Sequence, residues 1–246
     1  MKNKAFVSVT LISAIVLSLA QSLAFSAPEE KADSAKKKGI NASGIWKWTS
    51  RGRNGETRES SMALFQAGKR LTGKITGGRA DSEIENGKIE GNKISFSTSR
   101  KTERGSFTSE YSATLDGGKL KGLRKFAFGD RSFEREWDAK REPTDPTGSW
   151  NWVLDRGDGQ TFEATMKLKM DNHKVTGSLG RDDFQIEIRN GKVEGPVLTF
   201  ETVYEREGEA RRSLNTAVVV GKLMKGTSKR VSDGESRVRN WKATKS

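Results

Sequence analysis

Cysteine is absent from this chain of 246 residues, and histidine occurs once, at His173. The lack of thiols excludes disulfide bonds, cysteine nucleophiles and cysteine-based metal sites. A single imidazole also excludes a metal centre with several histidines, and no nucleophile, base and acid are spaced as in a catalytic triad. We therefore predict no catalytic residues, no metal site and no cofactor, and we expect the protein not to be an enzyme.

Long apolar runs are also scarce, and the chain has one, from Ala5 to Ala20, between Lys4 and the next charge at Glu29. The run is shorter than the ~20 residues of a membrane-spanning helix. Small residues follow it at the spacing of a cleavage site, which predicts a signal peptide at 1–26. An uncleaved anchor is the alternative. We expect a flexible tether at 27–42 and an exported protein, periplasmic or extracellular, without a transmembrane segment after cleavage.

Acidic residues are the minority among the charges, since 45 Lys and Arg outnumber 32 Asp and Glu and give a net charge of +13. A basic chain suits an acidic partner, such as an anionic glycan or a membrane surface. The basic residues alternate with acids along the chain, however, which also fits an ordinary solvated surface. Nucleic acid is not an expected partner, and the oligomeric state is open.

The sequence repeats itself at a constant offset of 104 residues. The stretch GIWKW at Gly44 recurs as GSWNW at Gly148, NGKIEG at Asn86 recurs as NGKVEG at Asn190, and the later pairs keep the same offset. Such a long register indicates two copies of one unit. We predict a first domain at 43–142, a short linker containing proline at 143–147, and a second domain at 148–246.

Within each copy the apolar residues alternate with polar ones, which is the pattern of half-buried β-strands. The first copy is expected to hold eight strands, near 44–50, 57–66, 70–77, 80–86, 92–100, 107–115, 119–127 and 132–140, with Asn86-Gly87 as one of the turns. No segment has a helical period. The predicted fold is all-β, with two tandem eight-stranded antiparallel up-and-down barrels, and a sandwich is the alternative.

The G-x-W motif at the start of each copy resembles the signature of the calycin superfamily, which includes lipocalins, fatty-acid-binding proteins and avidins. The stretch MALFQAGKRLTGKI is also similar to the second and third strands of avidin-type barrels. The resemblance implies a barrel whose tryptophan closes one end, with an arginine of the last strand across the ring. We match that arginine to Arg135 for Trp46 and to Arg239 for Trp150. The helix usual in lipocalins is not evident, and no ligand is carried over.

Eight residues form the candidate ligand site, four in each copy. They are Trp46, Trp48, Arg135 and Trp137 in the first copy and Trp150, Trp152, Arg239 and Trp241 in the second. Alternation places each set on one inward face. Small residues share this face, namely Gly73, Ala113, Gly122, Gly177, Ala217 and Gly226. These small residues either make room for the indole rings or leave a cavity, so both packing and a ligand pocket stay open.

The leading hypothesis is an exported, non-enzymatic protein that binds a small apolar or aromatic ligand in its barrels. The alternative is a basic cell-envelope protein that binds anionic polysaccharide or a membrane surface, with filled barrels as a scaffold. A hydrolase or isomerase that works with carboxylates alone is the third hypothesis. The RGD sequence at Arg156 is better explained as a polar turn, because the first copy has SRGR in its place.

Overall fold

The structure is a computed structural model that describes residues 40–246 apart from 52–53, 78–79, 103–104, 129–130, 157 and 232–235. The predicted signal peptide and most of the predicted tether therefore lie outside the described residues. All regular structure in the described part is β-strand. Within it, no helix is long and apolar enough to cross a bilayer.

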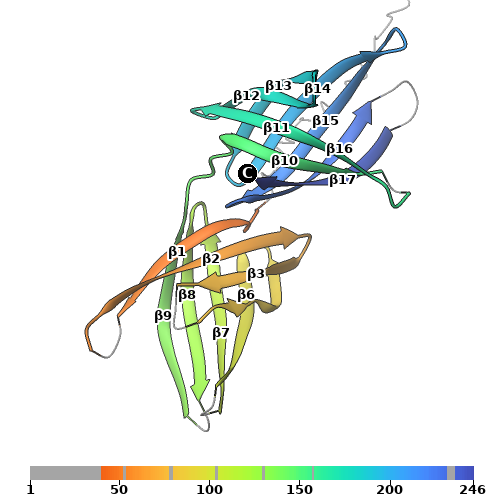
Figure 1. The fold of residues 1–246 in the computed structure, drawn as a ribbon. Coiled ribbons are helices and arrows are strands. Elements are labelled where there is room, and N and C mark those ends of the chain that lie inside the picture. The colour runs from red at the N-terminus through yellow and green to blue at the C-terminus, as the bar shows by residue number, and fades with distance from the viewer. Residues whose placement is uncertain are drawn as a thin grey trace, which may run out of the picture. The chain divides into compact units, whose positions relative to one another are not determined.

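The first copy forms a closed antiparallel barrel (Figure 1). Its strands are β1 (Gly44–Arg51), β2 (Thr57–Ala67), β3 (Arg70–Thr76), β4 (Ser82–Glu83), β5 (Glu85–Glu90), β6 (Lys93–Thr102), β7 (Gly105–Asp116), β8 (Lys119–Phe128) and β9 (Arg131–Arg141). Strand β1 pairs with both β2 and β9, which closes the ring. The ring has eight strands, because β4 is a two-residue addition to β3.

The second copy closes in the same order without an added strand. Its strands are β10 (Gly148–Asp155), β11 (Thr161–Asp171), β12 (Lys174–Arg181), β13 (Phe184–Glu194), β14 (Val197–Arg206), β15 (Glu209–Val220), β16 (Leu223–Val231) and β17 (Ser236–Lys245). Strand β10 pairs with β11 and β17. The predicted fold, two eight-stranded up-and-down barrels, is confirmed.

The prediction of a turn at Asn86-Gly87 is wrong. Asn86 lies inside β5 with a φ of 52°, where the pairing with β6 shifts register between Glu85 and Lys88. The second copy repeats the irregularity at Asn190, which has a φ of 51°. Asparagine tolerates this left-handed conformation better than most residues, so it suits a β-bulge as well as a hairpin turn. The bulge bends the strand, as closure of a small barrel requires.

Each barrel has its own apolar core, formed by the inward residue of each alternating pair. Two glycines, Gly122 and Gly226, lie on this inward face directly opposite Trp137 and Trp241 of the last strand. A Cβ atom on Gly226 would lie 2.6 Å from the ring of Trp241. A Cβ atom on Gly122 would collide with the carbonyl oxygen of Ser112. These glycines make room for close packing.

Replacing Gly226 by alanine should destabilise the second barrel by about 1–3 kcal/mol, because the added methyl group overpacks the core against Trp241. Chemical denaturation followed by tryptophan fluorescence measures the change. Gly118→Ala is the control, since the nearest atom to its added Cβ, in Arg141, lies 4.0 Å away. Equal stability of Gly226→Ala and Gly118→Ala would contradict the packing role.

Candidate functional site

One end of each barrel is closed by a tryptophan on its first strand. Trp46 and Trp150 are completely buried. The indole nitrogen Nε1 of Trp46 donates to the carbonyl oxygen of Ala42 at 2.9 Å, and Nε1 of Trp150 donates to that of Pro146 at 2.8 Å. Both bonds reach back four residues, so the segment before each first strand folds over the ring. These two rings therefore have a structural role in their barrels.

A cation of the last strand covers each of these rings, but it is not the predicted one. The guanidinium carbon of Arg141 lies 4.6 Å from the ring centre of Trp46, and Nζ of Lys245 lies 5.4 Å from that of Trp150. The assignment of Arg135 to Trp46 is therefore wrong, as is that of Arg239 to Trp150. In the closing pairs, Trp46 faces Arg141 and Trp150 faces Lys245. The stagger of the closing strands thus sets which residue reaches the ring.

The glycine of each G-x-W motif lies under the same cation. Gly44 has a φ of 132° and Gly148 a φ of 129°, a region that side chains other than glycine rarely adopt. A Cβ atom on Gly44 would lie 3.1 Å from Cδ of Arg141, and one on Gly148 would lie 2.8 Å from Cε of Lys245. The motif is therefore explained by close approach as well as by backbone conformation.

The remaining tryptophans meet in the middle of each barrel, as the sequence predicts. The rings of Trp48 and Trp137 lie 5.6 Å apart edge to face, and those of Trp152 and Trp241 lie 6.0 Å apart. Phe96 packs on Trp137 from β6. These contacts fill the middle of the first barrel with aromatic rings. Packing at this level agrees with the glycines opposite the rings.

The inner face changes character toward the opposite end of the first barrel, here called the first mouth. Three arginines reach this face, namely Arg100, Arg124 and Arg135. Sequence reasoning missed Arg100 and Arg124. The guanidinium of Arg124 lies 5.2 Å from the ring centre of Tyr111 and donates to Oγ of Ser109 at 3.0 Å. No ion pair joins these arginines to a carboxylate among the described residues.

Aromatic rings accompany the arginines of the first mouth. Arg100 lies 5.4 Å from the ring centre of Phe107, and Arg135 lies 5.8 Å from that of Phe126. The Nε atoms of Arg100 and Arg124 are buried without a hydrogen-bond partner. Burial raises the pKa of Tyr111, while the charge of Arg124 opposes that rise. The mouth therefore offers fixed positive charge and flat apolar surface together.

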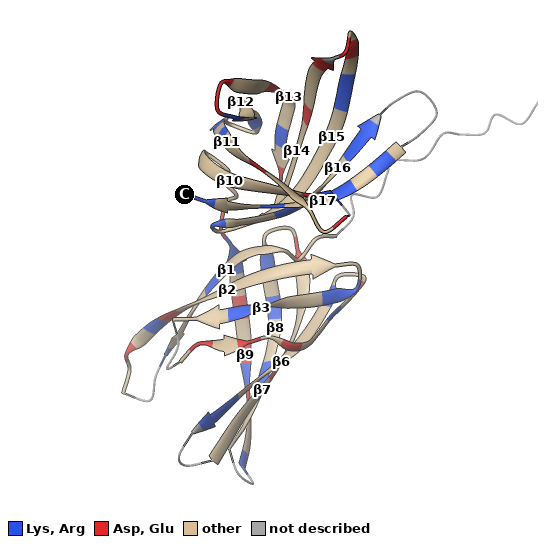
Figure 2. Ribbon diagram, turned by 45° about the vertical axis from the view of Figure 1, so that its right-hand side comes forward, with Lys and Arg blue, Asp and Glu red and all other residues tan. Residues whose placement is uncertain are grey.

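The corresponding end of the second barrel, the second mouth, is richer in arginine. Arg230 and Arg237 face each other across β16 and β17, and Ser228 faces Arg239. Arg230 donates to the hydroxyl oxygen of Tyr204 at 3.0 Å. The Nε atom of Arg239 is buried without a partner. Figure 2 shows basic segments on both strands.

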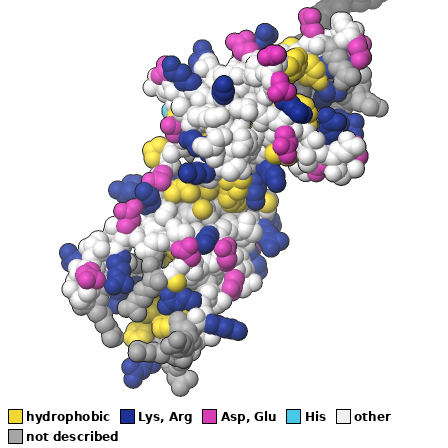
Figure 3. Space-filling view, viewed as in Figure 1, with side chains coloured by type: hydrophobic (Ala, Val, Ile, Leu, Met, Phe, Trp, Pro, Cys, Tyr) yellow, Lys and Arg dark blue, Asp and Glu magenta, His cyan; other side chains and the backbone are white. Residues whose placement is uncertain are grey.

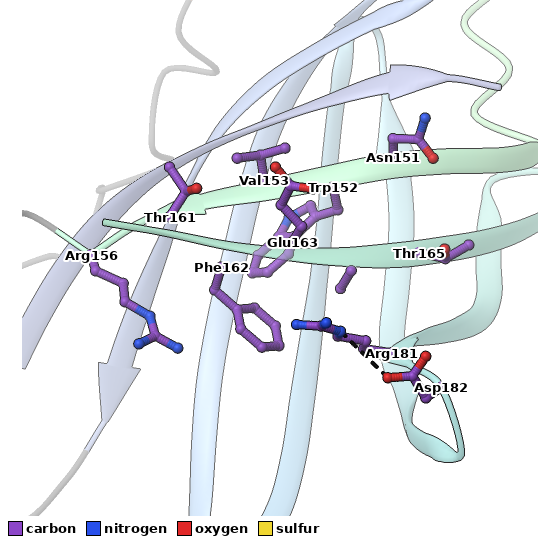
Figure 4. Close-up of a pocket in the computed structure, with 11 residues that line it drawn as sticks. Asn151, Trp152, Val153, Arg156, Thr161, Phe162, Glu163, Thr165, Arg181 and Asp182 are labelled. Atoms are coloured by element: carbon purple, nitrogen blue, oxygen red, sulfur yellow. Dashed lines mark ion pairs between the residues drawn. The ribbon is translucent and has the colours of Figure 1, made fainter. Parts of the chain in front are cut away.

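A cavity of about 550 Å³ opens beside this mouth, between the start of β11 and its neighbours (Figure 4). Trp152, Phe162 and Ala164 line it together with Arg156 and Arg181 and with the acids Glu163 and Asp182. Figure 4 shows Phe162 between the two guanidinium groups. Arg156 lies 5.6 Å from the ring centre of Phe162, and Arg181 pairs with Asp182 at 3.4 Å. The volume is within the range of small-molecule sites.

The other candidate motifs provide no site. Arg156 of the RGD sequence contacts Phe162, while Asp158 accepts a hydrogen bond from the backbone of Gln160 within the turn; Gly157 lies outside the described residues. His173 is exposed in the turn between β11 and β12. Where side chains are described, no three His, Asp or Glu residues come together to bind a metal ion.

The outer surface carries both signs of charge. Figure 3 shows basic and acidic side chains interspersed over the face in view. Lys47 illustrates the arrangement, since its Nζ atom lies 2.7 Å from Glu142 and 3.5 Å from Glu59. The hydrogen bond to Glu142 is the main cause that raises the pKa of Lys47. Exposed pairs of this kind contribute little to stability.

Comparisons with models of protein families, with curated proteins and with solved structures give no match. The site is therefore interpreted from its own geometry.

Removing the cation over Trp46 tests its role in closing the barrel. Arg141→Gln should destabilise the first barrel by about 1–3 kcal/mol, because it removes the cation–π contact and a charge-assisted bond. That bond runs from Arg141 to the carbonyl oxygen of Asn41 at 2.6 Å. Arg141→Lys should lose less stability, since Lys245 occupies the corresponding position over Trp150 in the second barrel. Thermal unfolding measures both.

The control for Arg141 is Lys140→Gln, which changes an exposed neighbour on the outer face. Its expected effect is below about 0.5 kcal/mol. If Lys140→Gln and Arg141→Gln destabilise equally, the loss comes from net charge and not from the ring contact. Burial lowers the pKa of Arg141 to about 10, so both measurements at neutral pH compare a charged residue with a neutral one.

Proposed function

We propose that this chain is an exported, non-enzymatic binding protein whose barrels take small anionic ligands with a flat apolar part. The observation that carries the proposal is the division of each barrel interior. One end and the middle are filled by tryptophan, whereas the mouth presents arginines beside aromatic rings. If these arginines served only stability, they would be expected to form ion pairs with carboxylates.

The composition of the mouths defines the ligand class. Guanidinium groups bind carboxylate, sulfonate and phosphate oxygens with two parallel hydrogen bonds. Aromatic rings provide stacking surface for an apolar or aromatic body. The small apolar or aromatic ligand expected from the sequence alone fits less well when it carries no anionic group, because it would leave Nε of Arg124 buried without a partner. The likeness to calycins agrees with ligand binding inside a barrel, and export rests on the predicted signal peptide.

A second function is favoured by the filled middle of each barrel. In that alternative, the barrels are scaffolds, and basic side chains on the outer surface bind anionic polysaccharide or a membrane surface. Such binding should weaken steeply with salt, since exposed charges are screened over about 8–10 Å at physiological ionic strength. Binding inside a mouth should depend on salt much less.

Titration calorimetry with naphthalene-1-sulfonate and 1-naphthol tests the proposed ligand class. We expect the sulfonate to bind at least about tenfold more tightly, because only it pairs with the arginines. Arg124→Gln should abolish binding at the first mouth and leave the second. Lys125→Gln is the control, since Lys125 points outward and pairs with Glu134. If neither compound binds, the proposal is excluded. If Arg124→Gln and Lys125→Gln lose the same amount of binding, the first mouth is not the binding site.

A further inference from the structure

The two mouths differ at two successive pairs of inward positions across the last two strands. The pair nearer the core is Arg124 and Arg135 in the first barrel and Ser228 and Arg239 in the second. The pair nearer the rim differs in charge. In the first barrel the pair is Phe126 and Phe133, whose rings stack at 5.3 Å with an interplanar angle of 20°. In the second barrel, 104 residues later, it is Arg230 and Arg237. Like charges directly opposite each other destabilise a sheet. The first copy shows that the fold accepts an apolar pair at this position.

Two more arginines add to the positive charge at the second mouth. Burial lowers the pKa of Arg239, and the charges of Arg237, Arg230 and Arg156 lower it further. Asp158 is the one described carboxylate that opposes this shift. No ion pair links these four arginines to an acid among the described residues. At the second mouth the positive charges therefore outnumber the one described carboxylate, Asp158, that offsets them at Arg239.

The geometry points to a phosphate-monoester site at the second mouth, formed by Arg156, Arg230, Arg237 and Arg239. This inference rests on the proposed function and assigns the second barrel a ligand with two negative charges on one group. Phosphate monoesters carry nearly two charges at neutral pH and three acceptor oxygens. A pair of facing guanidinium groups can bind several of those oxygens at once. The first mouth has a phenylalanine pair in the same place, and its own facing arginines, Arg124 and Arg135, lie one inward pair nearer the core, where Arg124 is held by Tyr111 and Ser109.

The rest of the ligand would lie against the rings beside the arginines. Tyr204 is held by Arg230 and contacts Phe184, whose ring centre is 6.2 Å away. Phe162 lies next to Arg156, which also lines the cavity of about 550 Å³. The shared chemistry is therefore a phosphate monoester with an apolar body. Two sources satisfy it, a soluble small molecule and the headgroup of a lipid such as phosphatidic acid.

Calorimetry with 1-naphthyl phosphate and naphthalene-1-sulfonate, which share one ring system, tests the inference on the purified protein. We expect the phosphate to bind the second mouth at least about tenfold more tightly than the sulfonate. The double variant Arg230→Phe, Arg237→Phe should bring this ratio to about one, because it replaces the facing arginines by the phenylalanine pair of the first mouth. Lys229→Gln is the control and should keep the ratio, because Lys229 is exposed on the outer face of β16 next to Arg230.

The double variant also has a readout that needs no ligand. It should melt at a higher temperature than the original protein, since it removes facing like charges. The phosphate should raise the melting temperature of the original protein more than that of the double variant. Arg237→Gln, a single change at an exposed side chain, replaces the double variant if that variant does not fold, and should reduce the ratio at least about threefold.

The outcomes separate the two proposals. Binding of the sulfonate with no preference for the phosphate would overturn the phosphate site and leave the proposed function intact. Binding of neither compound would overturn both. If the preference for the phosphate over the sulfonate persists in the double variant and in Arg237→Gln, the phosphate binds elsewhere and the proposed phosphate site is wrong. Sedimentation with phosphatidic acid vesicles and not with phosphatidylcholine vesicles would identify the lipid source, whereas soluble phosphate binding alone would identify the small molecule.

Discussion

The burial of one indole at the end of each barrel is the constraint from which the other features follow. Trp46 and Trp150 are fully enclosed and keep their single donor paired through a carbonyl four residues earlier. Their rings need a cover, which the last strand supplies through an aliphatic stem and a cation. That stem passes close to the glycine of the motif, whose positive φ other residues rarely adopt. One buried ring thus accounts for the glycine of the motif, the cation above it and the closed end of the barrel.

The sequence predicted the barrels and the buried tryptophans, because period-two alternation and a constant offset are properties of the chain alone. The cation over each ring could not be predicted the same way. Residues 135, 137, 139 and 141 all share the inward face, so alternation cannot choose among them. The choice depends on how far the closing strands are staggered, which pairs Trp46 with Arg141. Stagger is a property of the whole ring of strands.

The Asn-Gly pairs show a second limit of local sequence reasoning. Asn86 and Asn190 adopt the left-handed conformation that the pair favours, so the local conformational expectation was sound. The interpretation as a hairpin turn failed because the same conformation also creates a bulge within a strand. Only the neighbouring strand decides between the two, and the neighbour of β5 continues past the bulge. The arginine-rich mouths were missed for a similar reason, since their members are distant in sequence.

Comparison of the two copies separates what the fold requires from what it allows. The closed ends agree in ring, glycine and backbone bond, with arginine above the indole in one copy and lysine in the other. The mouths share a backbone pairing yet differ in side chains, with phenylalanines in one and arginines in the other. Because the same framework accepts both pairs, stability does not dictate the arginines. Facing arginines also occur in the first mouth, at Arg124 and Arg135, so the contrast between the copies concerns the pair nearer the rim, where we propose that an anion lies between Arg230 and Arg237.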